Sequence, residues 1–195
     1  MRMALSTGLP PIVNSGANVL VVGSLPSRKS IEISEYYAHP QNAFWRIMGE
    51  LFGAGCDVPY AERIDMLKAN NIAIWDVLAA SVRPGSMDSH IDLSRSKPND
   101  FMLFLKTYSD IRLMCFNGQK AAAMFGDMVL SEHCELCSGL RFETLPSTSA
   151  AFASMPFEEK LRKWAIVLQS AGSQCKVIKS EFSNSPKRRT TSDCS

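Results

Sequence analysis

The chain has 195 residues, of which 46% are hydrophobic and 21% are charged, and its formal net charge at pH 7 is +2. That length and composition fit one globular domain with a sizeable core. The small net charge does not indicate binding of polyanions by bulk electrostatics, although a local basic surface is compatible with it. Because no apolar run is long enough to span a membrane and the N-terminus lacks a signal pattern, we expect a cytoplasmic, nucleoid-associated protein that is not secreted and has no membrane partner.

Short apolar runs alternate with segments in which apolar side chains recur at helical spacing, which predicts alternating strands and helices. Continuous apolar runs of this length are typical of strands that are buried on both faces of a parallel sheet. The predicted strands cover residues 18–22, 72–77, 111–116 and 140–145, and the predicted helices run from about 40 to 53, 59 to 70, 98 to 108, 118 to 129 and 157 to 168.

Four strands separated by helices indicate the α/β class, as a three-layer α/β/α sandwich with a central four-stranded, mostly parallel sheet. Right-handed crossovers place the loops that follow the strands along one edge of the sheet, where open α/β folds bind ligands. The expected edge loops are residues 23–27, 76–91, 117–118 and 146–149, and the second of them is predicted to be long and polar.

The domain boundaries follow from the limits of the periodic pattern. We expect an N-terminal extension over residues 1–17, a single domain over residues 18–179, and a disordered basic tail over residues 180–195. The tail is rich in Ser, Thr, Lys and Arg and has almost no apolar residues, which is typical of a solvated segment.

The six cysteines do not have the spacing of a disulfide framework or of a zinc site. Cys134 and Cys137 form one C-x-x-C pair, with His133 beside it and no second pair at zinc spacing. We therefore expect free thiols, no metal and no other cofactor.

The segment from Tyr36 to Arg46 gathers polar, aromatic and conformationally special residues beside the end of the first strand. Asn42 is interpreted either as a helix cap or as an amide that holds a water or a base edge. His39 is a helix-entry residue or a catalytic group, and Tyr37 is a core aromatic or a stacking platform for a planar ligand. Spacing alone leaves each of these alternatives open.

The other edge loops exclude two common kinds of site. Residues 23–27 match neither the dinucleotide fingerprint nor the P-loop, which argues against binding of a nucleoside triphosphate. Residues 147–149 contain serines but no Gly-x-Ser-x-Gly elbow, so a serine nucleophile is not expected. Asn117 is either a turn residue beside Gly118 or a second amide that reads a ligand.

Gly23-x-x-Pro26 followed by His39-Pro40-x-Asn42-x-Phe44-Trp45 resembles the uracil-DNA glycosylase superfamily, and most closely its hypoxanthine-DNA (deoxyinosine) glycosylases. The resemblance covers roughly residues 18–168 and continues through residues 74–77, 83–89, 116–118 and 145–149. It implies a DNA glycosylase that hydrolyses the N-glycosidic bond of a deaminated base during base excision repair.

Two departures from the superfamily pattern affect the implied mechanism. Mismatch-specific members resemble this chain with an Asn in the first turn, where it positions the attacking water, and other uracil enzymes have an Asp; here the residue is Leu25. At the end of the fourth strand, relatives carry Asn or His, and here Ser147 is present. The hypoxanthine enzymes resemble the chain better, and by that resemblance Asn42 positions the water and Asn117 contacts the base.

The resemblance implies monofunctional hydrolysis, because no lysine stands in a motif as a nucleophile. The expected partner is double- or single-stranded DNA that contains deaminated bases, and the protein is expected to be a monomer. A uracil or mismatch-specific glycosylase and a catalytically decayed DNA-binding module remain the alternatives. The implied site comprises Asn42 as catalytic residue, Gly23, Ser24, Leu25, Tyr37 and Asn117 as base-binding residues, and His39, Ser147, Thr148, Ser149 and Phe152 as DNA-binding or loop residues.

Overall fold

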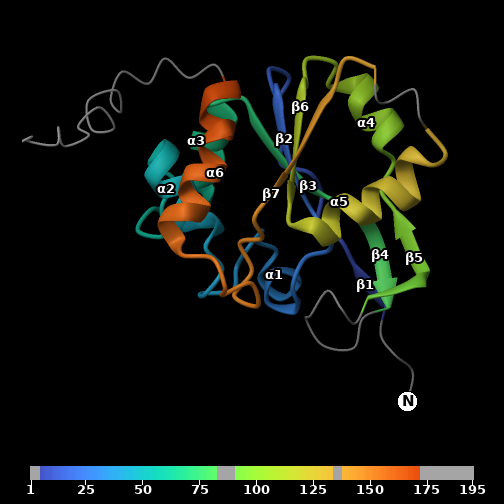
Figure 1. The fold of residues 1–195 in the computed structure, drawn as a ribbon, viewed down its shortest axis with the longest axis horizontal. Helices are drawn as coiled ribbons and strands as arrows, with labels where there is room; N and C mark the ends of the chain where they lie inside the picture. The colour runs from blue at the N-terminus through green and yellow to red at the C-terminus, as the bar shows by residue number, and fades with distance from the viewer. Residues whose placement is uncertain (1–4, 83–90, 134–137, 172–195) are drawn as a thin grey trace, which may run out of the picture.

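The computed structural model describes residues 5–82, 91–133 and 138–171. Its centre is a four-stranded sheet in the order β3-β2-β6-β7, in which every neighbouring pair is parallel. The four carboxyl ends therefore meet along one edge, at the lower side of Figure 1. This confirms the predicted α/β class and the four-stranded parallel sheet. The strands are β2 (Val19–Gly23), β3 (Ile72–Asp76), β6 (Leu113–Asn117) and β7 (Arg141–Leu145).

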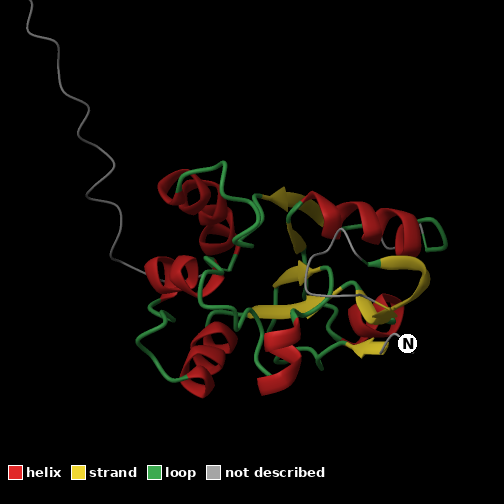
Figure 2. Cartoon of the chain, turned by 90° about the horizontal axis from the view of Figure 1, so that it is seen from below, coloured by secondary structure: helices red, strands yellow, loops and turns green. Residues whose placement is uncertain are grey.

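Helices cover both faces of this sheet, as Figures 1 and 2 show from two directions. Successive side chains of a strand point to opposite faces, so Val19 and Val21 pack in one core and Leu20 and Val22 in the other. Both faces of β2 are buried, which explains why the strand reads as a continuous apolar run. The helices on one face are α2 (Phe44–Phe52), α3 (Tyr60–Ala69) and α6 (Phe157–Ser170), and those on the other are α4 (Phe101–Thr107) and α5 (Gln119–Phe125), which a π-helical turn (Gly126–Leu130) continues.

A second, antiparallel sheet in the order β1-β4-β5 extends the fold beyond the sequence prediction. Its strands are β1 (Leu5–Thr7), β4 (Leu78–Val82) and β5 (Asp92–Pro98). The predicted loop over residues 76–91 is therefore wrong for residues 78–82, and residues 83–90 lie outside the described residues. β5 is polar enough to resemble a loop, and one of its hydroxyl groups is paired inside the sheet: Ser96 Oγ donates to the fully buried Ser81 Oγ of β4 at 2.8 Å.

The segment before the first predicted strand takes part in the same structure. β1 pairs with β4, and Ile12 forms a bridge with Ile74 of β3. A short helix, α1 (Arg28–Ile33), also went unpredicted; Ser27 caps it by accepting from the Ser30 N–H at 3.1 Å. The domain boundaries at residues 18 and 179 stay predictions. The predicted tail and the Cys134–Cys137 pair lie outside the described residues. No helix in the described part of the chain is long and apolar enough to cross a membrane.

The assignment of faces can be tested with two leucines. Leu20 is fully buried between the layers, whereas Leu103 on α4 is 62% exposed. We expect Leu20→Ala to lower the free energy of unfolding by about 2–5 kcal/mol, because it removes packed atoms and leaves a cavity. We expect Leu103→Ala to change it by less than about 0.5 kcal/mol. Urea unfolding of both variants measures the difference, and equal losses would contradict the placement of Leu103 toward solvent.

Candidate functional site

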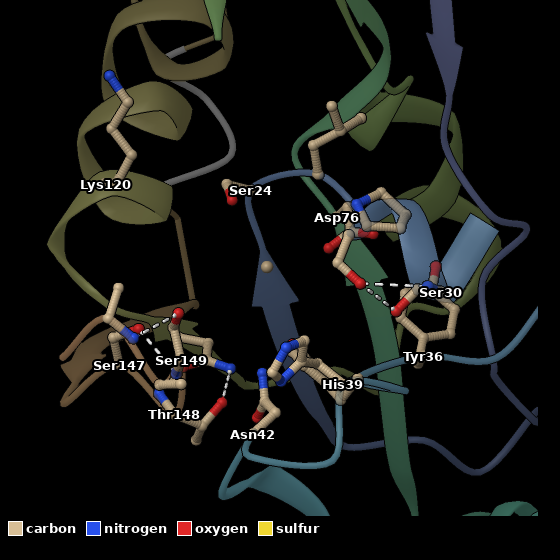
Figure 3. Close-up of a pocket in the computed structure, with 18 of the residues that line it drawn as sticks. Ser24, Ser30, Tyr36, His39, Asn42, Asp76, Lys120, Ser147, Thr148 and Ser149 are labelled. Atoms are coloured by element: carbon tan, nitrogen blue, oxygen red, sulfur yellow. Dashed lines mark hydrogen bonds between the residues drawn. The ribbon is translucent and has the colours of Figure 1, made fainter. Parts of the chain in front are cut away.

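A cavity of about 490 Å³ opens at the carboxyl edge of the parallel sheet (Figure 3). Its volume lies in the range of sites that bind small ligands. The loops that follow β2, β6 and β7 converge on it, together with the turn that precedes α2. All of the sequence-predicted site residues line this cavity: Gly23, Ser24, Leu25, Tyr37, His39, Asn42, Asn117, Ser147, Thr148, Ser149 and Phe152.

Asn42 reaches the cavity from a turn. The Asn42 N–H donates to the carbonyl oxygen of His39 at 2.8 Å, and Pro40 occupies the second position of this turn, which suits its fixed φ. The expectation that Pro40 lies in the first turn of a helix is therefore wrong, since α2 begins only at Phe44. A proline suits both settings equally, and nothing local distinguishes them.

The side chain of Asn42 makes one hydrogen bond within the protein and also lines the cavity. Its Oδ1 accepts from the Phe44 N–H at 3.0 Å, which satisfies a donor at the start of α2 and fixes the orientation of the amide. The side chain points into the cavity beside His39 (Figure 3). An amide oxygen has two lone pairs, so one lone pair of Oδ1 and both Nδ2 hydrogens are left for a ligand.

His39 is exposed at the mouth of the cavity. Its Nδ1 accepts from the Gln41 N–H at 3.2 Å. In the neutral ring the proton therefore sits on Nε2, which can donate to a ligand.

Gly23 lines the cavity at a point where the structure leaves no room for a side chain. A Cβ at this position would lie 2.2 Å from Oδ1 of Asp76 and 3.2 Å from the Tyr37 hydroxyl. Asp76, at the end of β3, is only 3% exposed and lines the cavity. Leu25 is 5% exposed and packs in the core on the α4 and α5 side, so this apolar side chain cannot hold a water.

The two adjacent tyrosines have different environments. Tyr37 has a φ of 55°, which is uncommon for a residue with a side chain, and its ring stacks on Phe44 with centroids 4.0 Å apart. Phe44 thus covers one face of a ring that lines the cavity. Tyr36 is 3% exposed and donates to carbonyls of the N-terminal segment; burial, and secondarily the charge of Asp76, raises the pKa of Tyr36 far above its ordinary value.

Asn117 and Thr148 pair with each other across the ends of β6 and β7. Asn117 Nδ2 donates to Thr148 Oγ1 at 2.8 Å, and the Thr148 N–H donates to Asn117 Oδ1 at 2.8 Å. Thr148 is 1% exposed, and its carbonyl oxygen accepts from the Ala43 N–H at 2.9 Å. The predicted contact of Asn117 with a base therefore has only the second Nδ2 hydrogen and the second Oδ1 lone pair to use.

Eight further residues line the cavity beyond the predicted set: Pro26, Ser27, Ser30, Tyr36, Asp76, Lys120, Ala150 and Ala151. Asp76 is a carboxylate at the end of a predicted strand, and the sequence pattern assigned it no role. Lys120 follows the Asn117–Gly118 turn, and Ser30 belongs to the unpredicted α1, so no sequence signal identified it. Across the described residues, no group of three or more His, Cys, Asp or Glu side chains is placed to hold a metal ion.

Comparison with known proteins identifies the family, although no protein-family model matches the chain. The chain is 37% identical over 150 residues to a "Hypoxanthine DNA glycosylase" from Methanosarcina acetivorans, covering 75% of this chain and 88% of the relative. A protein of the same name from Methanosarcina barkeri is 36% identical over 115 residues, which is 58% of this chain and 72% of the relative.

The chain belongs to the uracil-DNA glycosylase superfamily. Within it, the chain is close to the hypoxanthine DNA glycosylases, as the ordered motifs implied. A solution NMR structure of a "putative Uracil DNA glycosylase" from Methanosarcina acetivorans superimposes with a TM-score of 0.71 at 33% identity, covering 86% of this chain and 99% of that chain. The chain is an enzyme of the DNA glycosylase class, whose members hydrolyse N-glycosyl bonds.

The Asn117–Thr148 pair in this glycosylase can be tested through stability. Thr148→Val removes the hydroxyl that accepts from Asn117 Nδ2, and we expect the free energy of unfolding to fall by about 1–3 kcal/mol because a largely buried donor loses its partner. Thr107→Val is the matched control, since the exposed Thr107 hydroxyl bonds only within α4. Urea unfolding should give a change below about 0.5 kcal/mol for the control.

A double-mutant cycle separates the pair from other effects of the substitutions. We expect Thr148→Val to cost much less when Asn117 is already Ala, since the donor it would orphan is then absent. Additive losses in the cycle would contradict a direct interaction between Asn117 and Thr148.

Proposed function

We propose that the chain is a monofunctional DNA-deoxyinosine glycosylase, which hydrolyses the N-glycosidic bond of hypoxanthine in DNA during base excision repair. The observation that carries this proposal concerns the residue that positions water. The turn position that other superfamily members use for this purpose holds the buried Leu25. Asn42 points into the same cavity, with its amide oriented by the Phe44 N–H.

Recognition begins with extrusion of the damaged base. The sugar carbon cannot be reached inside the duplex, so the nucleotide must rotate out of the stack, and a deaminated base that pairs poorly leaves more readily. The cavity then receives the base against the ring of Tyr37, whose other face rests on Phe44. Stacking on a ring that is already held in place costs little ordering entropy.

Deamination also changes the hydrogen-bonding edge of the base. Adenine has an acceptor at N1, whereas hypoxanthine carries a hydrogen there. An ionised carboxylate only accepts, so Asp76 at the cavity floor favours the N1–H of hypoxanthine and repels the lone pair of adenine. A negative charge beside a base that leaves as an anion opposes bond breaking. We therefore assign Asp76 to recognition, at some cost in rate.

Bond breaking separates two developing charges, positive on the sugar and negative on the departing base. Backbone N–H groups of the turn at residues 23–27 lie beside the cavity and can stabilise the departing base, and preorganised donors of this kind are a major source of catalysis. Asn42 would accept a hydrogen of the attacking water with its second Oδ1 lone pair. An oxocarbenium-like sugar requires a well-placed water more than a strong base.

Monofunctional action is supported by the position of Lys120. Among the described residues that line the cavity it is the one lysine, and its side chain points away from Asn42 (Figure 3). A lysine that formed a Schiff base with the sugar would have to reach the carbon that Asn42 faces. Lys120 is exposed and suits a contact with a DNA phosphate instead.

Uracil is a second candidate substrate, and a specific observation favours it. Uracil carries a hydrogen at N3 where cytosine has an acceptor, so the same carboxylate of Asp76 would select it by the same rule. The NMR structure that shares the fold is described as a uracil enzyme. Both substrates belong to the class of deaminated bases.

The proposed function is tested by incubating the protein with duplexes that hold inosine, uracil or xanthine opposite each normal base, followed by alkaline cleavage of abasic sites. We expect strand breaks at inosine, and a loss of roughly a hundredfold or more in single-turnover rate for Asn42→Ala, because the water is no longer positioned. Gln41→Ala is the matched control, since this exposed neighbour carries the same amide outside the cavity. An Asn42→Ala rate equal to that of the control would refute the role of Asn42.

The recognition role of Asp76 makes a separate prediction. In Asp76→Asn the side chain can donate to N1 of adenine, so we expect the ratio of inosine to adenine cleavage to fall roughly tenfold or more. Single-stranded oligonucleotides remove the contribution of base pairing from this ratio. If both rates fell equally and the ratio stayed constant, Asp76 would serve to hold the turn at residues 23–27 and not to read the base.

A further inference from the structure

Lys160 on α6 is a buried lysine, with 6% of its surface exposed. Lysine is almost never buried to this extent unless it is paired, because desolvating an ammonium is costly. Burial lowers the pKa of Lys160 accordingly. No carboxylate of the described ranges forms an ion pair with it. Because the buried ammonium of Lys160 has so few partners, the contact that it does make is important for keeping it in this position.

That contact is with Phe152 at the rim of the cavity. Lys160 Nζ donates to the carbonyl oxygen of Phe152 at 2.6 Å and lies 5.0 Å from the centroid of its ring. A hydrogen bond from an ammonium is roughly twice as strong as a neutral one. Phe152 lines the cavity and is 36% exposed, so Lys160 anchors one of the few large apolar side chains that face solvent.

The same helix anchors the other end of this cavity wall. Trp164 lies one turn beyond Lys160 on α6, and its Nε1 donates to the carbonyl oxygen of Pro146 at 3.0 Å. Residues four apart share one face of a helix, so a single face of α6 binds both ends of residues 146–152. Thr148, bonded to Asn117, holds the middle of the segment. Of these three anchors, Lys160 is the one that directly sets the position of the exposed ring.

We propose that Lys160 is a positioning residue that holds the ring of Phe152 at the cavity mouth, where it contacts the DNA stack after the target base has left it. The inference rests on the proposed function. An extruded base leaves a gap in the duplex, and apolar side chains fill such gaps between bases in other DNA-binding proteins. A ring on an unanchored loop would lose conformational freedom on doing so, whereas the ammonium of Lys160 restricts the loop beforehand.

This role predicts a dependence on the form of the DNA. A side chain that fills a gap in a duplex contributes nothing on a single strand, which has no opposing stack to support. If Lys160 merely kept the cavity wall folded, its loss would reduce the cleavage of both forms equally. Comparing the two forms therefore distinguishes positioning of Phe152 from general support of the fold.

Lys160→Met keeps the length of the side chain and removes the ammonium, Lys160→Arg keeps a charged donor, and Lys163→Met is the matched control for charge on the exposed face of α6. Single-turnover rates are measured against protein concentration on an inosine duplex and on the same strand alone. We expect Lys160→Met to raise the half-saturating concentration on the duplex roughly tenfold, with the limiting rate changed less than about threefold. On the single strand we expect no change.

Two further results are expected if the ring is the element that Lys160 positions. Lys160→Arg should recover most of the duplex affinity, and Phe152→Ala should add little to the effect of Lys160→Met, because both substitutions act on one contact. Equal losses on duplex and single strand, or wild-type behaviour of Lys160→Met on both, would overturn the proposal. Circular dichroism at the assay temperature establishes that each variant is folded.

A binding measurement keeps this inference separate from the proposed function. Fluorescence anisotropy with a duplex that carries a tetrahydrofuran abasic-site analogue requires no cleavage. Weaker binding by Lys160→Met than by Lys163→Met would support the role of Lys160 even if inosine, uracil and xanthine were all left intact. Equal binding by the two variants would overturn that role, whatever the outcome of the cleavage assay.

Discussion

The reciprocal pair of hydrogen bonds between Asn117 and Thr148 is the interaction on which the geometry of the site depends. It joins the ends of two neighbouring strands, and the carbonyl of Thr148 extends the connection to the N–H of Ala43, next to Asn42. Two loops and a helix start, which lie far apart in the sequence, are thereby held in one frame. An amide that positions water, the role proposed for Asn42, is effective only if such a frame fixes it to within a fraction of an ångström.

Around this frame, buried polar groups gather where the two apolar cores end. Asp76, Thr148 and Lys160 are each less than a tenth exposed, and all three lie at or beside the cavity. Buried polar groups lower the stability of the fold unless they are paired. Their concentration at one edge of the sheet therefore indicates that this edge serves the function of the protein at a cost in stability. The two apolar cores on either side of the sheet are built from alternate side chains of the same strands, and their stability offsets this cost.

Two sequence expectations about local structure were wrong. Residues 78–82 were expected in a loop and form a strand, because pairing with β1 and β5 decides their conformation and buries Ser81. Pro40 was expected inside a helix and lies in a turn. Asn117 is still predicted to contact a base, and its pairing with Thr148 uses one of its two amide hydrogens and one of its two Oδ1 lone pairs. The strand at residues 78–82 and the Asn117–Thr148 pair depend on partners that are remote in the sequence, and local propensity carries no information about them.

The sequence by itself determined the class of fold, the edge at which the site lies and eleven of the residues that line it. Apolar periodicity specifies buried strands, and parallel crossovers bring their ends together. Only the tertiary structure decided which of those residues are buried and which contacts each of them makes. It placed Tyr36 in the core and Tyr37 in the cavity, set the carboxylate of Asp76 against Gly23, and turned a helical lysine, Lys160, inward onto Phe152. These assignments follow from packing across elements, where a single contact at about 3 Å between distant residues decides the direction of a side chain.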